Sequence, residues 1–151
     1  MREIFRQNSL PPDLAYMAVV ESGMNAAIGN PGGAAGWWQF TPLTAKHYGL
    51  RVDAQMDERS DVRKSTQAAC KYVRDLILDF GAGSSVMLAL AAYNLGPARV
   101  SQAIHQVKNP IQQRDFWYLY RMRALPIETR EYVPKVIASM IIARHPAQFG
   151  F

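Results

Sequence analysis

Hydrophobic residues recur at helical spacing along most of the chain, and no segment alternates apolar and polar residues as a strand would. The longest amphipathic pattern runs from Ser60 to Gly81, and the glycine is a typical helix terminator. Further helices are predicted at residues 41–48, 97–106, 114–123 and 127–145. The last of these contains Pro134, where we expect a kink. The pattern therefore predicts an all-α fold.

Two shorter helices are almost wholly apolar. The first covers residues 11–23, with prolines at its start, Asp13 in its first turn and a glycine at its end. It has almost no polar face, so we expect it to be buried on nearly every side. The second covers residues 84–96, and Ser84 or Ser85 is available as its N-cap.

Both apolar helices end in polar side chains, Glu21 on the first and Tyr93 with Asn94 on the second. Glu21 is the only acidic residue between Asp13 and Asp53, so no second carboxylate nearby in sequence can act with it as an acid or base. Apolar surroundings raise the pKa of a carboxyl group and suit it to general-acid catalysis. On spacing alone, a structural acid paired with an arginine or with backbone amides is the favoured explanation of Glu21.

The segment after the first apolar helix opens with a glycine-rich loop. Four of the eight residues 29–36 are glycines, which favours tight turns and close backbone approach. The aromatic residues Trp37, Trp38 and Phe40 follow, with Gln39 among them. Such rings stack on sugars and such amides bind hydroxyl or acetamido groups, although core packing is the simpler role for each ring. Together they indicate a carbohydrate site walled by this loop.

Composition and charge bound the class of protein. The chain has 151 residues, 49% hydrophobic and 19% charged, which is typical of one globular domain. We expect residues 1–151 to form a single domain, with residues 1–9 as a peripheral segment. The net charge of +5 favours polyanionic partners, but lysines and arginines are scattered, so a solvated surface explains them too. Nucleic acid is not expected, because the aromatic residues lie among apolar helices.

Metal and redox chemistry find little support. Cys70 is the single cysteine, so no internal disulfide forms, and His47, His105 and His145 lack zinc-type spacing. We therefore expect neither a metal nor a cofactor. We also expect no signal peptide and no membrane span in these residues, because no apolar run is long enough.

Five blocks of sequence, in order, resemble the family 1 lytic transglycosylases, the soluble-lytic-transglycosylase (SLT) domain. The resemblance runs from Leu10 to the C-terminus and is greatest to the lytic murein transglycosylase D group. The blocks are "ESGMN", "GAAGWWQFTPLTA", "YGLRVDAQMDERSDVRKSTQAA", "ALAAYNLGPARV" and "LPIETREYVPKVIA". This ordered match outweighs the structural explanation of Glu21.

The resemblance implies a lysozyme-like helical domain, of the goose-type lysozyme and SLT kind, that cleaves peptidoglycan. The bond cut would be the β-1,4 link between N-acetylmuramic acid and N-acetylglucosamine. Glu21 would be the single catalytic acid, and 1,6-anhydromuramic ends would form without addition of water. Attack by the muramic acid's own C6 hydroxyl needs no second carboxylate, which agrees with the isolation of Glu21.

Other residues carry over from the family by position. Ser22 follows the acid and would support it, and Tyr132 would lie near the acid. The substrate-binding residues implied by the resemblance are Asn30, Gly36, Gln39, Thr41, Tyr93, Asn94 and Tyr132. The chain departs from the family pattern at Asn30, where serine is usual, and at Thr41, where methionine is usual.

Two alternatives stay open on the same fold. A lysozyme-like or chitinase-type hydrolase would admit water in place of the C6 hydroxyl. A catalytically silent glycan-binding domain would keep the fold without turnover, a possibility raised by Asn30 and Thr41. Peptidoglycan strands are the expected partner, a monomer is the default state, and the implied substrate places the domain in the periplasm or cell envelope. Lipid anchors and LysM modules, frequent in this group, are not found in these residues.

Overall fold

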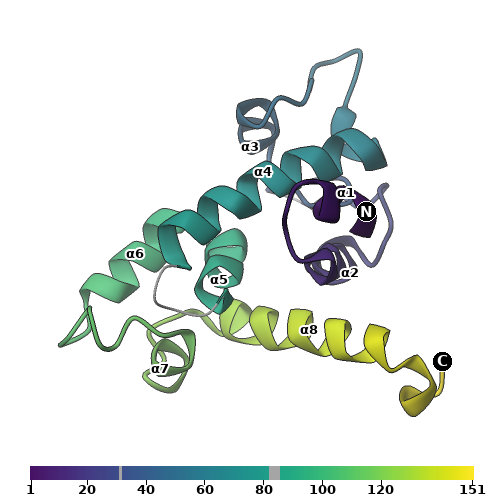
Figure 1. Ribbon diagram of the computed structural model, residues 1–151. Helices are drawn as coiled ribbons and strands as arrows, with labels where there is room; N and C mark the ends of the chain where they lie inside the picture. Colours follow the sequence, from purple (N-terminus) through teal and green to yellow (C-terminus); the bar gives the residue numbers. More distant parts are fainter. Residues whose placement is uncertain (31, 82–85) are drawn as a thin grey trace. The chain divides into compact units, whose positions relative to one another are not determined.

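The computed structural model describes residues 1–30, 32–81 and 86–151, and within them the chain forms helices and no strands (Figure 1). Isolated antiparallel bridges pair Gly29 with Ala35, Ala35 with Phe40, and Val52 with Asp57. The predicted all-α class is confirmed. The chain divides into two compact units, Met1–Tyr72 with Val136–Phe151, and Val73–Lys135. The expectation of one domain therefore stays a prediction.

The first unit is built mainly from short helices. They are α1 (Arg2–Gln7), η1 (Pro12–Tyr16), α2 (Met17–Ser22), α3 (Pro42–His47), η2 (Glu58–Ser60) and η3 (Pro146–Phe149), with the beginning of α4 (Val62–Phe80) and the end of α8 (Ile127–Arg144). Trp38 and Phe5 are fully buried, with ring centroids 5.5 Å apart, and the Trp38 indole donates to Thr66 at 3.1 Å. The segment 1–9, expected to be peripheral, thus contributes Phe5 to this core.

The helix predicted at residues 11–23 is found as η1 followed directly by α2. Gly23 ends it in the left-handed conformation, with φ 58°, as a glycine stop should. The expectation that it is buried on nearly every side is wrong, because Val19 is 39% exposed and Glu21 is half-buried. A six-residue helix buries one face, here Met17, Ala18 and Ser22, and turns the next residues outward.

Asp13, expected to interact with the helix dipole, forms ion pairs with two arginines. It is 8% exposed and accepts a hydrogen bond from Arg144 Nε at 2.6 Å and one from Arg2 at 3.3 Å. Arg144 is in the last turn of α8, so this ion pair fastens the end of α8 to η1 within the first unit. A carboxylate with two cationic donors is satisfied despite its burial.

The second unit contains α5 (Met87–Leu95), α6 (Pro97–His105) and α7 (Phe116–Arg121), with the rest of α4 and the beginning of α8. Five consecutive residues of α5, from Leu88 to Ala92, are buried, as its apolar sequence predicts. The predicted N-cap at Ser84 or Ser85 lies outside the described residues. Pro134 lies inside α8, which runs as one helix from Ile127 to Arg144, and the kink expected there stays a prediction.

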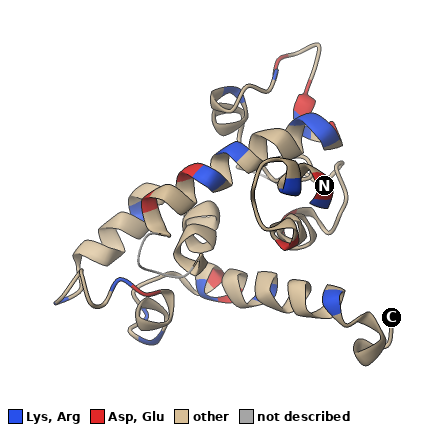
Figure 2. Ribbon diagram, in the orientation of Figure 1, with Lys and Arg blue, Asp and Glu red and all other residues tan. Residues whose placement is uncertain are grey.

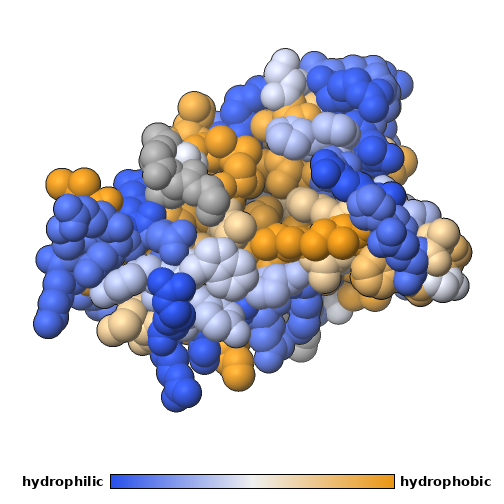
Figure 3. Space-filling view, turned by 60° about the horizontal axis from the view of Figure 1, so that its bottom comes forward, coloured by the Kyte–Doolittle hydropathy of each residue, from blue (hydrophilic) through white to orange (hydrophobic). Residues whose placement is uncertain are grey.

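Charged and apolar residues are both spread over the surface. Lysines and arginines occur on many separate segments (Figure 2), in agreement with the scattered pattern in the sequence. Hydrophobic side chains also reach the surface (Figure 3), and the most exposed large ones are Leu43, Leu78, Ile111 and Phe151. No helix among the described residues is both long enough and apolar enough to cross a bilayer.

Candidate active site

Glu21 lies in the last turn of α2, immediately before a sharp reversal of the chain. Gly23 and Met24 both adopt left-handed conformations, with φ 58° and 61°, and the Asn25 amide donates to the Ser22 carbonyl at 3.0 Å. Methionine is uncommon in this conformation, which costs about 1 kcal/mol or more. The reversal separates the half-buried Glu21 from the exposed residues that follow it.

Ser22 ties the end of α2 to the aromatic segment. Its hydroxyl is within hydrogen-bond distance of two carbonyl oxygens, those of Ala18 at 3.1 Å and Trp37 at 3.0 Å. The residue is 2% exposed, so these bonds are shielded from water. The residue next to Glu21 is therefore held against residues 36–40, and its support of the acid stays a prediction.

Gln39 holds the glycine-rich loop through side-chain hydrogen bonds. Its side-chain nitrogen donates to the carbonyls of Ile28 and Gly36, at 2.9 Å each, and its own backbone is left-handed with φ 48°. Both amide protons are therefore used within the loop. The side-chain oxygen is the atom that Gln39 can offer to a sugar hydroxyl or acetamido N–H.

Gly36 is required by a close approach of two backbones. It has φ 79°, and a Cβ placed there would lie 2.1 Å from the carbonyl oxygen of Arg59. No side chain fits at that distance, so the glycine permits contact between residues 33–40 and η2. The close approach expected from the four glycines is confirmed at this position, and the effect of Gly36 is on the shape of the loop.

Arg59 is a buried cation that holds the same loop and was not singled out from the sequence. It is 8% exposed, and Nη1 donates to the carbonyls of Gly33 at 2.7 Å and Phe40 at 2.9 Å. Nε and Nη2 bind the Asp57 carboxylate at 2.9 and 2.6 Å. The hydrogen bond from Arg59 is the main reason that the pKa of Asp57 is lowered.

Asn30 and Thr41 use their side-chain oxygens within their own turns. Asn30 Oδ1 accepts from the Ala34 amide at 3.1 Å. Thr41 is the N-cap of α3, with Oγ1 accepting from the Thr44 amide at 3.2 Å and lying 2.9 Å from the Thr44 hydroxyl. Both side chains therefore have a structural function in their own turns.

Tyr72 is an aromatic residue whose pKa responds to the charge of Glu21. Burial is the main cause that raises the pKa of its hydroxyl above the ordinary 10.0, and the negative charge of Glu21 is the second. Its ring lies 5.0 Å from that of Tyr48 and 6.2 Å from that of Phe40. In the sequence Tyr72 was recognised only as part of the apolar face of a long helix. Its position within the helical period could not distinguish it from core residues.

Tyr93, Asn94 and Tyr132 belong to the second unit. Asn94, in the last turn of α5, accepts a hydrogen bond from the hydroxyl of Thr129 at 2.8 Å, and Thr129 is 1% exposed. Tyr132, on α8, is 5% exposed, and Tyr93 is half-buried. The bond from Thr129 fixes the orientation of the Asn94 amide, because the oxygen must face the hydroxyl.

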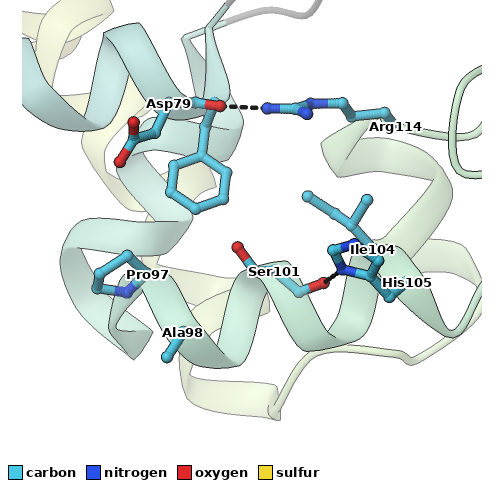
Figure 4. Close-up of a pocket in the computed structure, with 8 residues that line it drawn as sticks. Asp79, Pro97, Ala98, Ser101, Ile104, His105 and Arg114 are labelled. Atoms are coloured by element: carbon cyan, nitrogen blue, oxygen red, sulfur yellow. Dashed lines mark hydrogen bonds between the residues drawn. The ribbon is translucent and has the colours of Figure 1, made fainter.

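A cavity in the second unit contains none of the predicted site residues (Figure 4). Arg114 and Ser101 point into it from opposite sides. The guanidinium of Arg114 donates to the backbone carbonyl of Asp79 and lies 5.9 Å from the centre of the Phe80 ring. Because none of the predicted site residues lines this cavity, it is not the candidate active site.

Comparison with solved structures identifies the class of fold. The lytic transglycosylase Slt from Pseudomonas aeruginosa, solved as an inactive mutant, superposes with a TM-score of 0.73 at 21% identity, over 93% of this chain and 22% of that one. The lysozyme-like, SLT-type helical fold expected from the sequence is therefore confirmed.

The family follows from the sequence comparison. Residues 2–116 match the model of the transglycosylase SLT domain, and the chain belongs to this family. It is 35% identical over 145 residues to membrane-bound lytic murein transglycosylase D of Escherichia coli (strain K12), covering 96% of this chain and 31% of the relative. It is 29% identical over 121 residues to membrane-bound lytic murein transglycosylase F of Yersinia pseudotuberculosis, covering 80% and 24%. The chain thus spans about a third or less of these relatives.

Proposed function

We propose that this chain is a peptidoglycan lytic transglycosylase with Glu21 as its single catalytic acid. The observation that carries the proposal is the placement of Glu21, at the end of α2 beside a loop held by Ser22, Gln39 and Arg59, in a chain of the SLT family. The relatives' names, as lytic murein transglycosylases, support the same substrate.

In the proposed reaction, Glu21 gives its proton to the glycosidic oxygen as the bond from that oxygen to C1 of the muramic acid breaks. The resulting carboxylate then takes the proton of the C6 hydroxyl while that oxygen bonds to C1. The proton returns to Glu21, no water is consumed, and the product ends in 1,6-anhydromuramic acid. Intramolecular attack needs the sugar to be held in place, which is the function proposed for Gln39 and the loop around it.

The residues in contact with glycan are part of the same proposal. Asn30, Gly36, Gln39 and Thr41 would shape the glycan surface of the first unit. For Tyr93, Asn94 and Tyr132, glycan binding is proposed from the match of their motifs, and the fixed amide of Asn94 supports it. From the proposed substrate we infer that the domain works in the periplasm or cell envelope, and a monomer is its default state.

Mass spectrometry of fragments released from purified peptidoglycan tests the reaction type. We expect muropeptides that lack one water relative to hydrolysed ends. Ends with that water present would show a lysozyme-like hydrolase. Sedimentation of the folded protein with the polymer, without any release, would show a glycan-binding domain.

A further inference from the structure

A second cavity in the Val73–Lys135 unit is lined by basic and amide side chains. Its volume is about 320 Å³, and it lies between one face of α6 and the segment that follows α7. Helix α6 contributes Arg99 and Gln102, and its C-cap contributes Gln106; the three share a face because Gln102 and Gln106 lie three and seven residues after Arg99. Arg123 lines the cavity from the segment after α7.

Arg99 occupies a position that does not favour the helix. It is the third residue of α6, in the first turn, where the peptide dipoles produce a partial positive charge. A cation there weakens the helix, whereas an acid or a neutral residue would not. Its charge adds to the positive potential of this helix end, where anions are favoured.

Arg123 also occupies a position where another residue is favoured. It is left-handed, with φ 54°, directly after the C-cap Met122. The Arg123 amide donates to the Tyr120 carbonyl and the Ala124 amide to the Leu119 carbonyl, at 3.1 and 3.0 Å, which together form a Schellman motif. Glycine is the usual residue at this position, so the arginine is not explained by the turn.

The two arginines meet no opposing charge in this cavity. No carboxylate is among its lining residues, and within residues 1–30, 32–81 and 86–151 neither guanidinium forms an ion pair. By contrast, Lys64 lines another cavity together with Glu58 and is paired with it at 2.5 Å. The Arg99–Arg123 cavity is therefore a site of uncompensated positive charge.

From these features we infer that the Arg99–Arg123 cavity binds a carboxylate-bearing peptide. Guanidinium groups bind carboxylates through paired hydrogen bonds, and the amides of Gln102 and Gln106 can both donate to and accept from a peptide backbone. In peptidoglycan this ligand is the stem peptide, an identification that rests on the proposed function. Glu21, the proposed catalytic acid, does not line this cavity.

The experiment is an NMR titration of the full chain, following the side-chain amide signals of Gln102 and Gln106. The probes are a soluble stem tetrapeptide with free carboxylates and the same peptide with its carboxylates amidated. We expect saturable shifts with the first probe and affinity about tenfold weaker with the second, since a charge-assisted pair is lost. Equal affinity for both probes, or no shifts at millimolar peptide, would overturn the inference. The inference would also be overturned if inorganic phosphate displaced the free-carboxylate peptide at the same concentration as the peptide itself, because the cavity would then be a general anion site.

Two variants separate binding from folding. Arg123→Gly should weaken the free-carboxylate peptide about tenfold while leaving the melting temperature unchanged or higher, because glycine suits the left-handed position. Arg99→Gln should weaken it similarly without loss of α6. Arg121→Gln, on the neighbouring helix and not lining the cavity, is the matched control and should bind like the parent. Unchanged affinity in both cavity variants would refute the inference.

Failure of this inference is distinguishable from failure of the proposed function. Anhydro fragments released by the parent, together with no peptide binding, would refute the cavity assignment alone. Peptide binding without anhydro fragments would refute the transglycosylase and leave the cavity as a peptide site.

Discussion

The substitution Gly36→Ala tests whether the loop beside Glu21 depends on backbone contact with Arg59. The new Cβ would lie 2.1 Å from the Arg59 carbonyl oxygen and 2.5 Å from its carbonyl carbon. An ordinary carbon–oxygen contact is about 3.3 Å, so one backbone must move by about 1 Å. That movement strains the bonds from Arg59 to the carbonyls of Gly33 and Phe40.

The expected loss has two parts. The left-handed backbone at φ 79° disfavours alanine by about 1 to 2 kcal/mol. Weakening one charged hydrogen bond of Arg59 adds about 1.5 to 3 kcal/mol. The free energy of unfolding should therefore fall by about 2.5 to 5 kcal/mol, which lowers the melting temperature by roughly 5 °C or more for a chain of this size.

Gly33→Ala is the matched control, measured by urea denaturation followed by circular dichroism. Gly33 has φ 78°, and the nearest atom to its added Cβ is Pro42 Cδ at 3.9 Å. It should lose only the backbone part, about 1 to 2 kcal/mol. Equal losses in the two variants would refute the claim that close approach to Arg59 shapes the loop.

Three further results are expected. Thr129→Val removes the hydrogen-bond donor to Asn94 and should lower the free energy of unfolding, measured by urea denaturation, by about 1 kcal/mol. An unchanged free energy would show that water replaces this hydrogen bond. Glu21→Gln should lower the pKa of Tyr72 only partly in a spectroscopic titration, because burial is the larger cause; an unchanged pKa would contradict their proximity. Asp57→Asn should be less stable than the parent at neutral pH. Because the folded pKa of Asp57 lies below 3.8, its stabilising effect is present above that pH and is lost as the pH falls through the folded value. The difference in free energy of unfolding between the parent and Asp57→Asn, measured by denaturation at several pH values, should therefore become smaller below about pH 4. A difference that stays constant with pH would exclude this ion pair as its source.

Much of the fold could be predicted because local signals specify it. The apolar period and Gly81 bound α4 at Val62–Phe80, and Gly23 ends α2 where the sequence indicates. Thr41 caps α3 as a threonine before a proline should. These features depend on residues within one or two turns of each other.

Features that depend on distant residues were missed or wrong. Arg59 lies in the polar run "DERSD", and its burial follows from carbonyls of residues 33 and 40 that only the fold brings near. Phe5 reaches the core by meeting Trp38. Val19 is 39% exposed although its helix is apolar, since the sequence of one helix does not specify which of its sides other elements cover. The candidate site shows the same division. Glu21 and Gly36 are proposed from sequence motifs, whereas the influence of Glu21 on Tyr72 depends on how α4 packs.

The central claim is that Glu21 carries the chemistry, and Glu21→Gln tests it most directly. This change keeps the side-chain shape and removes the titratable proton, while Glu3→Gln makes the same change at an exposed residue that pairs with Arg6. Fragments released from purified peptidoglycan by the parent and by both variants are identified by mass spectrometry. The account predicts anhydro-ended fragments from the parent and from Glu3→Gln, and none from a folded Glu21→Gln. Release of such fragments by Glu21→Gln at the parent's rate would contradict it.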